Sequence, residues 1–133
     1  MSGASWLGTI AEVGTRILIV DDDASFLGLV AELLAERGFD ILGQAMDAGE
    51  ALAAALRECP DGILLDINLP GRGGFATATA LSQACPSARI VLTSAEVRNV
   101  AAEILRGCSA YAFVPKEELA TTDLEDLFRR AGT

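Results

Sequence analysis

The sequence predicts an α/β fold in which helices cover a parallel β-sheet. From residue 16 onward, short apolar runs rich in β-branched residues alternate with longer segments rich in Ala, Leu and Glu. In the longer segments, apolar residues recur three and four positions apart, which is typical of amphipathic helices. Regular alternation of strands and helices favours a parallel sheet. At 133 residues, the chain has the length of one domain.

Five strands and five helices are expected, in alternation. The apolar runs predict strands at Arg16–Val20, Asp40–Gln44, Gly62–Asp66, Arg89–Thr93 and Tyr111–Val114. The other segments predict helices at Ala24–Arg37, Ala48–Glu58, Phe75–Ala84, Val97–Arg106 and Thr122–Arg130. Gly38 is a stop signal after the first helix, and Cys-Pro pairs at 59–60 and 85–86 end the next two.

One domain is expected over residues 16–133, preceded by an N-terminal arm at residues 1–15. Five strand–helix pairs leave no room for a second domain, and the chain has no internal repeat. The arm is expected to be either flexible or one further helical turn. Trp6 is large and apolar, which favours docking of the arm at a place that the sequence does not identify.

Composition argues against several classes of function. The net charge of −9, without any basic run, argues against nucleic-acid binding. The apolar stretches are too short to span a bilayer and the first residues lack a signal-peptide pattern, so we expect a cytoplasmic protein without a membrane partner. Cys59, Cys85 and Cys108 are widely spaced, and the chain has no histidine. We therefore expect small core residues, and neither a disulfide framework nor a zinc site.

Polar residues follow the expected strands where these strands end. They are Asp21, Asp22, Asp66, Thr93 and Lys116. The carboxyl ends of parallel strands meet at one edge, where open α/β sheets bind ligands. Two carboxylates about 4 Å apart repel by roughly 4 kcal/mol near a protein surface, so we expect Mg²⁺ to balance the cluster. A remaining carboxylate is then a candidate nucleophile toward phosphorus, with Lys116 and Thr93 holding phosphoryl oxygens.

Four motifs fall at the strand ends that this chemistry requires. They are the acidic pair in LIVDDD, then LLDINLPGRGGF, IVLTSA, and the lysine of FVPKEEL. With these motifs, the chain from Arg16 to Arg130 resembles the receiver domains of two-component response regulators, such as the chemotaxis regulators. The resemblance implies a flavodoxin-like sheet of five parallel strands in the order 2-1-3-4-5, with five helices on both faces.

The resemblance also implies a role for each residue of the site. Asp66 is expected to be the phosphoacceptor. The implied Mg²⁺ ligands are Asp21, Asp22, Asp66 and the backbone carbonyl of Asn68. Thr93 is the expected switch hydroxyl, and Lys116 is expected to pair with the phosphoryl group. Pro70 and Gly74 are expected to shape the loop after the acceptor.

The chain departs from the family pattern around its lysine. Glu117 follows Lys116 where many receivers have a proline, and Pro115 precedes the lysine, so the loop after the fifth strand is expected to take another path. The aromatic switch residue of the family usually lies three positions before the lysine, which is Phe113 here. Tyr111 stands two residues earlier, and the sequence leaves both residues open for this role.

The leading hypothesis is a signalling module that accepts a phosphoryl group from a phosphohistidine of a sensor histidine kinase or phosphotransfer protein. Such a receiver catalyses its own phosphorylation and dephosphorylation. It is expected to signal through the surface of the fourth helix, fifth strand and fifth helix, by contact with an unidentified downstream protein, a further phosphorelay step or dimerisation.

Two alternatives remain open at this stage. The first is a pseudo-receiver that binds a partner without phosphorylation. The second is a Mg²⁺-dependent aspartyl-phosphate hydrolase, because Asp21 and Asp23 have the Asp-x-Asp spacing of such enzymes. The chain has no room for their cap domain, and Asp23 fits better as the N-cap of the first helix.

Overall fold

Five parallel strands form one sheet in the order β2-β1-β3-β4-β5. The structure, a computed structural model, describes residues 14–128. Its strands are β1 (Arg16–Val20), β2 (Asp40–Ala45), β3 (Gly62–Asp66), β4 (Arg89–Ser94) and β5 (Ala112–Pro115). The predicted fold class and strand order are confirmed, and each strand lies within one residue of its expected bounds.

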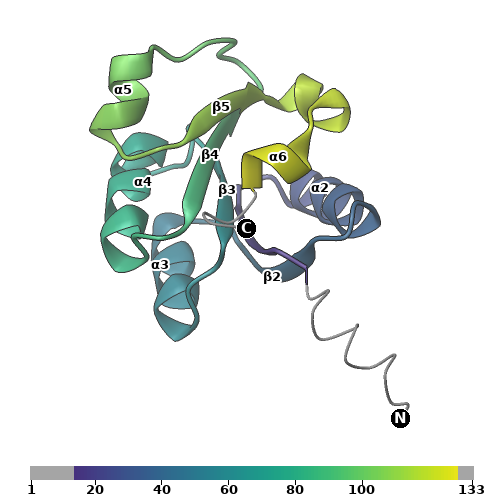
Figure 1. Cartoon of the computed structure of the whole chain (residues 1–133). Helices are drawn as coiled ribbons and strands as arrows, with labels where there is room; N and C mark the ends of the chain where they lie inside the picture. The colour runs from purple at the N-terminus through teal and green to yellow at the C-terminus, as the bar shows by residue number, and fades with distance from the viewer. Residues whose placement is uncertain (1–13, 129–133) are drawn as a thin grey trace.

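Helices cover both faces of the sheet (Figure 1). One face carries α2 (Ala24–Glu36), the 3-10 helix η1 (Lys116–Thr121) and α6 (Leu124–Phe128). The other face carries α3 (Ala48–Arg57), α4 (Gly73–Ala84) and α5 (Ala102–Gly107). The part of the chain that the structure describes thus holds five α-helices, as predicted, and η1, which the sequence patterning did not predict.

Alternation along the strands decides which layer each side chain faces. The strand residues under α3 and α4 include Leu18, Ile63, Leu65, Ile90 and Leu92, and those under α2 and α6 include Ile17, Ile19, Leu64, Val91 and Val114. Successive side chains of a strand point to opposite faces. Asp21, Asp66, Thr93 and Lys116 each lie two residues beyond a member of the second set. The alternation therefore directs all four toward the α2 side of the sheet edge.

The helix before β5 starts later than predicted. A helix was expected over Val97–Arg106, but α5 spans Ala102–Gly107 and buries none of its residues. Ser94 Oγ accepts the backbone N–H groups of Glu96 and Val97, both at 3.0 Å. A side-chain acceptor of this kind stabilises a turn in competition with the helix, so residues 95–101 form a loop.

The segment after β5 also differs from the prediction. The chain enters η1 directly at Lys116 through a trans peptide bond. The predicted helix Thr122–Arg130 begins at Leu124 instead, and its last two residues lie outside the described part.

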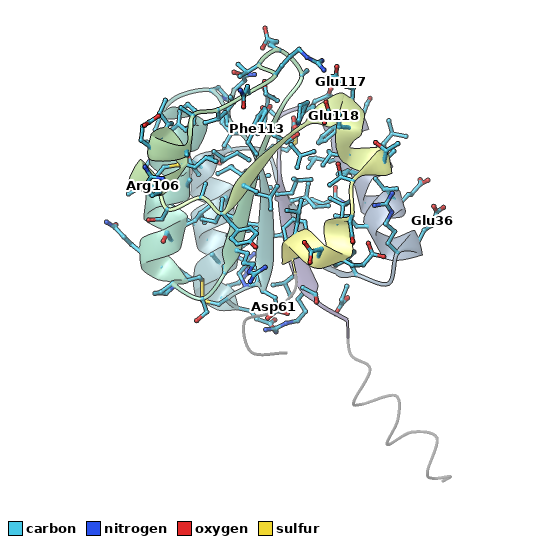
Figure 2. The ribbon with its side chains drawn as sticks, turned by 45° about the horizontal axis from the view of Figure 1, so that its top comes forward. Glu36, Asp61, Arg106, Phe113, Glu117 and Glu118 are labelled. Carbon is cyan, nitrogen blue, oxygen red and sulfur yellow. A yellow bond between two sulfur atoms is a disulfide. The ribbon has the colours of Figure 1, made fainter. Side chains whose placement is uncertain are left out.

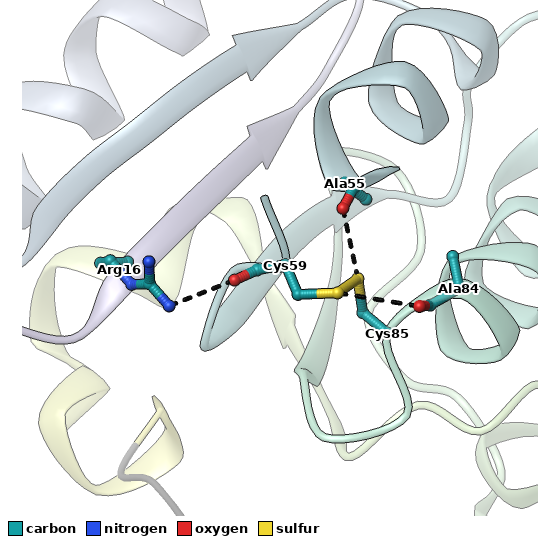
Figure 3. The surroundings of a disulfide bond; sticks show 5 residues. All are labelled: Arg16, Ala55, Cys59, Ala84 and Cys85. Carbon is teal, nitrogen blue, oxygen red and sulfur yellow. Dashed lines mark hydrogen bonds between the residues drawn. A yellow bond between two sulfur atoms is a disulfide. The ribbon is translucent and has the colours of Figure 1, made fainter. Parts of the chain in front are cut away.

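The expectation of three unpaired cysteines was wrong. Cys59 and Cys85 form a disulfide, with Cα atoms 5.6 Å apart (Figure 3). Cys59 follows α3 and Cys85 caps α4, and these helices lie side by side on one face of the sheet. Their C-terminal ends therefore meet, although 26 positions separate the cysteines. Cys108 is a buried thiol, as expected of a core residue.

Most of the predicted N-terminal arm lies outside the described residues. Of residues 1–15, the structure describes only Gly14 and Thr15. The carbonyl of Thr15 accepts the Asp40 N–H at 2.9 Å, so the chain enters the domain beside the turn that follows α2. Over residues 14–128, no helix combines the length and apolar character that crossing a membrane requires.

Candidate functional site

The predicted site residues converge at the carboxyl ends of the strands. Asp21 follows β1, Asp66 ends β3, Thr93 pairs in register with Asp66, and Lys116 follows β5. Asp21 and Thr93 are fully buried, and Asp66 is only 4% exposed. Asp22 is exposed, but one oxygen each from Asp21, Asp22 and Asp66 lies within 4.8 Å of the other two.

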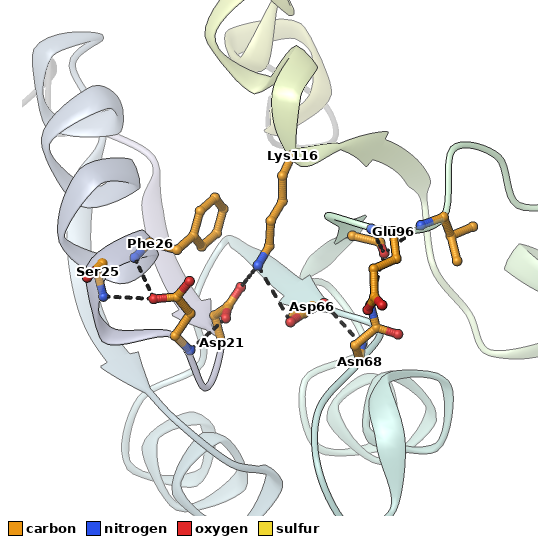
Figure 4. A network of polar contacts seen from close by, with 10 residues as sticks. Asp21, Ser25, Phe26, Asp66, Asn68, Glu96 and Lys116 are labelled. Carbon is orange, nitrogen blue, oxygen red and sulfur yellow. Dashed lines mark hydrogen bonds and ion pairs between the residues drawn. The ribbon is translucent and has the colours of Figure 1, made fainter.

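The Lys116 ammonium lies between the two buried carboxylates (Figure 4). Its Nζ is 2.8 Å from Asp21 Oδ2 and 3.7 Å from Asp66 Oδ2. The same Nζ lies 4.1 Å from the centroid of the Phe26 ring, a cation–π contact that the sequence did not predict. Since Asp22 is also nearby, one ammonium leaves two of the three negative charges without a balancing cation.

Backbone N–H groups hold one oxygen of each buried carboxylate. Asp21 Oδ1 accepts the N–H of Asp23 at 2.8 Å, and Asp66 Oδ1 accepts the N–H of Asn68 at 3.0 Å. The other oxygen of each group faces Lys116. These bonds fix the orientation of both carboxylates and leave one oxygen of each directed at the site.

The Asp23 side chain caps α2, as predicted. Its Oδ1 accepts the N–H groups of Ser25 at 3.0 Å and Phe26 at 3.2 Å. This bonding starts the helix immediately after the acidic run. It also engages the second Asp of the Asp-x-Asp spacing that the hydrolase alternative requires.

Burial and neighbouring charges shift the pKa values of Asp66 and Lys116. Burial raises the pKa of Asp66, and the charge of Asp21 adds to this effect, against the lowering effects of the Asn68 N–H and Lys116. Burial lowers the pKa of Lys116, but the hydrogen bond and charge of Asp21, together with the charge of Asp66, raise it by more. Lys116 therefore stays charged, and Asp66 becomes a more basic carboxylate, which favours nucleophilic attack.

The loop after Asp66 folds tightly back on the strand end. Gly71 and Gly73 have φ angles of 78° and 80°, a region that favours glycine. A Cβ on Gly74 would lie 2.3 Å from Ile67 Cα and 2.7 Å from the Asp66 carbonyl oxygen. Only glycine at position 74 lets α4 start this close to Asp66, in line with the expected role of Gly74.

The Thr93 hydroxyl is a buried polar group of the site without a hydrogen-bond partner among the described residues. Its Oγ1 is buried and makes no hydrogen bond within the described residues. By contrast, the neighbouring Ser94 Oγ accepts the Asn68 Nδ2 amide at 3.0 Å, and that amide also donates to Glu96 Oε1 at 3.1 Å. Sequence reasoning did not find this link between the acceptor loop and the β4–α5 loop.

The two candidate aromatic residues lie at different levels of β5. Phe113 is half-buried within the strand, in register with Leu92, one position before Thr93 (Figure 2). Tyr111 precedes the strand and is 51% exposed, and the Arg89 guanidinium lies 4.2 Å from its ring centroid. Phe113 is therefore nearer along its strand to the end that carries Lys116.

This combination of fold and site occurs in a known family. The sequence profile of the response regulator receiver domain matches residues 17–129. The chain belongs to this family. Receiver domains in general bind Mg²⁺ at an acidic pocket and act together with kinases or phosphotransfer proteins and downstream effectors.

Curated relatives share the domain but are mostly longer proteins. The chain is 33% identical over 106 residues to the transcriptional regulatory protein PdtaR of Mycobacterium tuberculosis, covering 80% of this chain and 51% of PdtaR. It is 31% identical over 80 residues to the chemotaxis protein CheY of Bacillus subtilis, covering 60% of this chain and 67% of CheY. The chain thus spans about half the length of PdtaR.

Solved structures share the fold over most of the chain. The chemotaxis protein CheY4 of Vibrio cholerae superposes with a TM-score of 0.76 at 26% identity, covering 88% of this chain and 98% of CheY4. A response regulator of Burkholderia pseudomallei, solved with a phosphorylated aspartic acid, a calcium ion and citrate, has a TM-score of 0.75 at 26% identity, covering 85% of this chain and 66% of that one.

The donor set of the site fits a hard divalent cation. Carboxylate oxygens are the protein ligands that Mg²⁺ prefers, and Mg²⁺ is commonly held by one or two carboxylates together with waters and phosphate oxygens. The three carboxylates carry two charges more than Lys116 balances, which matches the charge of such an ion. The buried Thr93 hydroxyl, which has no hydrogen-bond partner in residues 14–128, also favours a further oxygen-rich group at this edge.

Proposed function

We propose that this protein is a signalling receiver in which Asp66 accepts a phosphoryl group from a phosphohistidine of a sensor histidine kinase or a phosphotransfer protein. A carboxylate oxygen of Asp66 attacks phosphorus while the P–N bond to the imidazole breaks. The imidazole leaves with the bonding electron pair and takes up a proton. The observation that carries this proposal is the buried Asp66 carboxylate with Lys116 Nζ 3.7 Å away.

The surrounding residues would stabilise the charge that develops on the phosphoryl oxygens. Lys116 is positioned to pair with one oxygen, and the unbonded Thr93 hydroxyl can donate to another. Mg²⁺, held by Asp21, Asp22, Asp66 and the Asn68 carbonyl, would neutralise oxygens of the same group. The same groups would support phosphorylation from a small donor and self-catalysed dephosphorylation by water.

The output is proposed to be a protein contact made by α5, β5 and α6. Thr93 would turn toward the phosphoryl group, and Phe113 on the adjacent strand would respond to this movement. α5 buries none of its residues, and elements with few buried contacts move at low free-energy cost. The recipient would be an unidentified downstream protein or, in a phosphorylation-dependent dimer, a second copy of the chain. The cytoplasm is the proposed location.

The first experiment is intact-mass measurement after incubation with acetyl phosphate, with and without Mg²⁺. We expect the wild type to gain one phosphoryl group only when Mg²⁺ is present. Asp66→Asn should gain none, because it lacks the nucleophilic oxygen. Asp40→Asn is the matched control, since Asp40 is an exposed aspartate at the start of β2, at the opposite edge of the sheet.

A time course separates a short-lived adduct from no adduct. Sampling from the first seconds, with acid quenching, should capture the phosphorylated form before it hydrolyses. Mg²⁺ binding without an adduct at any time point would reject phosphorylation and favour the pseudo-receiver alternative. An adduct that persists in Asp66→Asn would place the acceptor at another residue.

A further inference from the structure

An apolar groove runs between α2 and η1, next to the site, and shares Phe26 and Lys116 with it. It has a volume of about 450 Å³, and its apolar lining includes Phe26, Leu29, Leu33 and Leu119. Leu29 is 70% exposed, among the highest exposures of the large apolar side chains described. Apolar surface of this kind commonly marks a docking site.

Polar contacts hold the groove open at both ends. At one end Lys116, which lines the groove, is anchored by Asp21. At the other end the Arg37 guanidinium donates to the carbonyls of Ala120 (a further lining residue) and Thr122. The Arg37 bonds tie the end of α2 to η1, and the Lys116–Asp21 pair ties η1 to the loop before α2. A ligand would therefore enter a groove whose walls are already in place, which lowers the entropy cost of binding.

The chain beyond the described residues begins within reach of this groove. Thr15 bonds to Asp40, and a Cβ on Gly14 would lie 2.4 Å from the carbonyl oxygen of Gly38, the residue that ends the turn after α2. Gly14, the first described residue, therefore lies beside the C-terminal end of α2. Thirteen residues span about 45 Å when extended and about 20 Å as a helix. Because α2, also of 13 residues, is about 20 Å long, a segment of this length can reach along the whole helix.

The sequence of residues 1–13 suits an apolar groove. Trp6, Ile10 and Val13 recur at the i, i+4 and i+7 spacing with which helices insert into such grooves, and Leu7 adjoins Trp6. Glu12 is the single charged side chain of the segment, so docking would desolvate little charge. A short tether also raises the effective concentration to about the millimolar range, so a weak contact suffices.

We propose that residues 1–13 of this chain occupy the groove between α2 and η1, with Trp6 as the apolar anchor. This contact does not require phosphorylation of Asp66, and it goes beyond the proposed function. It makes the N-terminal segment an intramolecular competitor for any partner that binds the α2 face.

Trp6 is the only tryptophan of the chain, so its fluorescence reports on the segment directly. In the wild-type chain of 133 residues we expect blue-shifted emission and weak quenching by acrylamide. Leu29→Glu places a charge in the groove and should reduce the docked population about tenfold, with red-shifted emission and stronger quenching. Leu56→Glu is the matched control, because Leu56 is 74% exposed on α3, on the other face of the sheet.

The outcomes decide between occupants. Solvent-exposed Trp6 in the wild type, or equal quenching in the wild type and Leu29→Glu, would overturn the proposal. Shielding of Trp6 that increases with protein concentration would also overturn it, because the occupant would then be a second copy. Circular dichroism of each variant verifies that the fold is retained. All readouts are taken on the unphosphorylated protein, so they test the docking even if Asp66 accepts no phosphoryl group.

Discussion

Breaking the Cys59–Cys85 disulfide should lower the free energy of unfolding by roughly 3.5 kcal/mol. The bond closes a loop whose ends are 26 positions apart. The closed loop lowers the conformational entropy of the unfolded chain. For a loop of this length, the chain-entropy relation gives the loss of roughly 3.5 kcal/mol. The Cα separation of 5.6 Å lies in the common range for disulfides, so we expect little native-state distortion to offset the gain.

The perturbation is best made at Cys59. Cys59 is exposed, whereas Cys85 is 1% exposed, so Cys59→Ser breaks the bond without adding a polar group to the core. Urea unfolding followed by far-UV circular dichroism should give a lower midpoint for Cys59→Ser than for the oxidised wild type. Reductant should lower the wild-type midpoint to a similar value and leave that of Cys59→Ser unchanged.

Counting thiols tests the pairing itself. The chain has three cysteines, and in the oxidised, denatured protein only Cys108 should react with a thiol reagent. Three reactive thiols without reductant would show that the bond does not form. A single thiol with a midpoint that is insensitive to reductant would refute the loop-closure reasoning while leaving the pairing intact.

Three further predictions concern the site and its supporting loop. Gly74→Ala should destabilise the folded protein by about 2 kcal/mol, because the new Cβ meets backbone atoms. The control Gly28→Ala, in open space on α2, should stabilise the protein by about 0.5–1 kcal/mol. Similar urea midpoints for the two variants would contradict the packing argument. Asp66→Asn should raise Tm at pH 7, because the raised pKa of Asp66 means that its ionised form destabilises the folded protein. The increase in Tm should shrink as the pH falls through the raised pKa toward the ordinary value of 3.8, where Asp66 becomes protonated. An increase that stays constant between pH 7 and pH 4 in thermal unfolding would reject this cause. Lys116→Met should destabilise by about 3 kcal/mol, because it leaves two buried carboxylates without their cation; an unchanged urea midpoint would show that these ion pairs contribute little.

Much of the site could be predicted because strand ends are a local property of the sequence. The apolar run before Asp21 and the run before Asp66 each end at a carboxylate, and parallel strands bring such ends together at one edge. Which oxygen contacts which nitrogen could not be predicted in this way. The position of Lys116 over Phe26 depends on how α2 packs against η1. The residues of these two segments do not by themselves show that packing.

The missed features share one cause. Ser94 Oγ accepts the N–H of Glu96, which precedes the predicted helix, and that of Val97, the predicted first residue of the helix, and residues 95–101 form a loop before α5. The hydrophobic period of a sequence does not show that such a side-chain acceptor competes with a helix. The repeated Cys-Pro pairs marked two helix ends correctly, but the spacing did not show that these ends meet. That became visible only when α3 and α4 were placed on the same face of the sheet.

The sequence by itself determined the alternation of strands and helices, the order of elements along the chain and the residues at the strand ends. These follow from spacings of two to four residues, which local backbone geometry imposes. The tertiary structure alone decided the disulfide, the Asn68–Ser94–Glu96 link, the Lys116–Phe26 contact and the groove beside η1. These depend on how distant segments pack, because close packing of several elements at once, and not any local spacing, brings their side chains into contact.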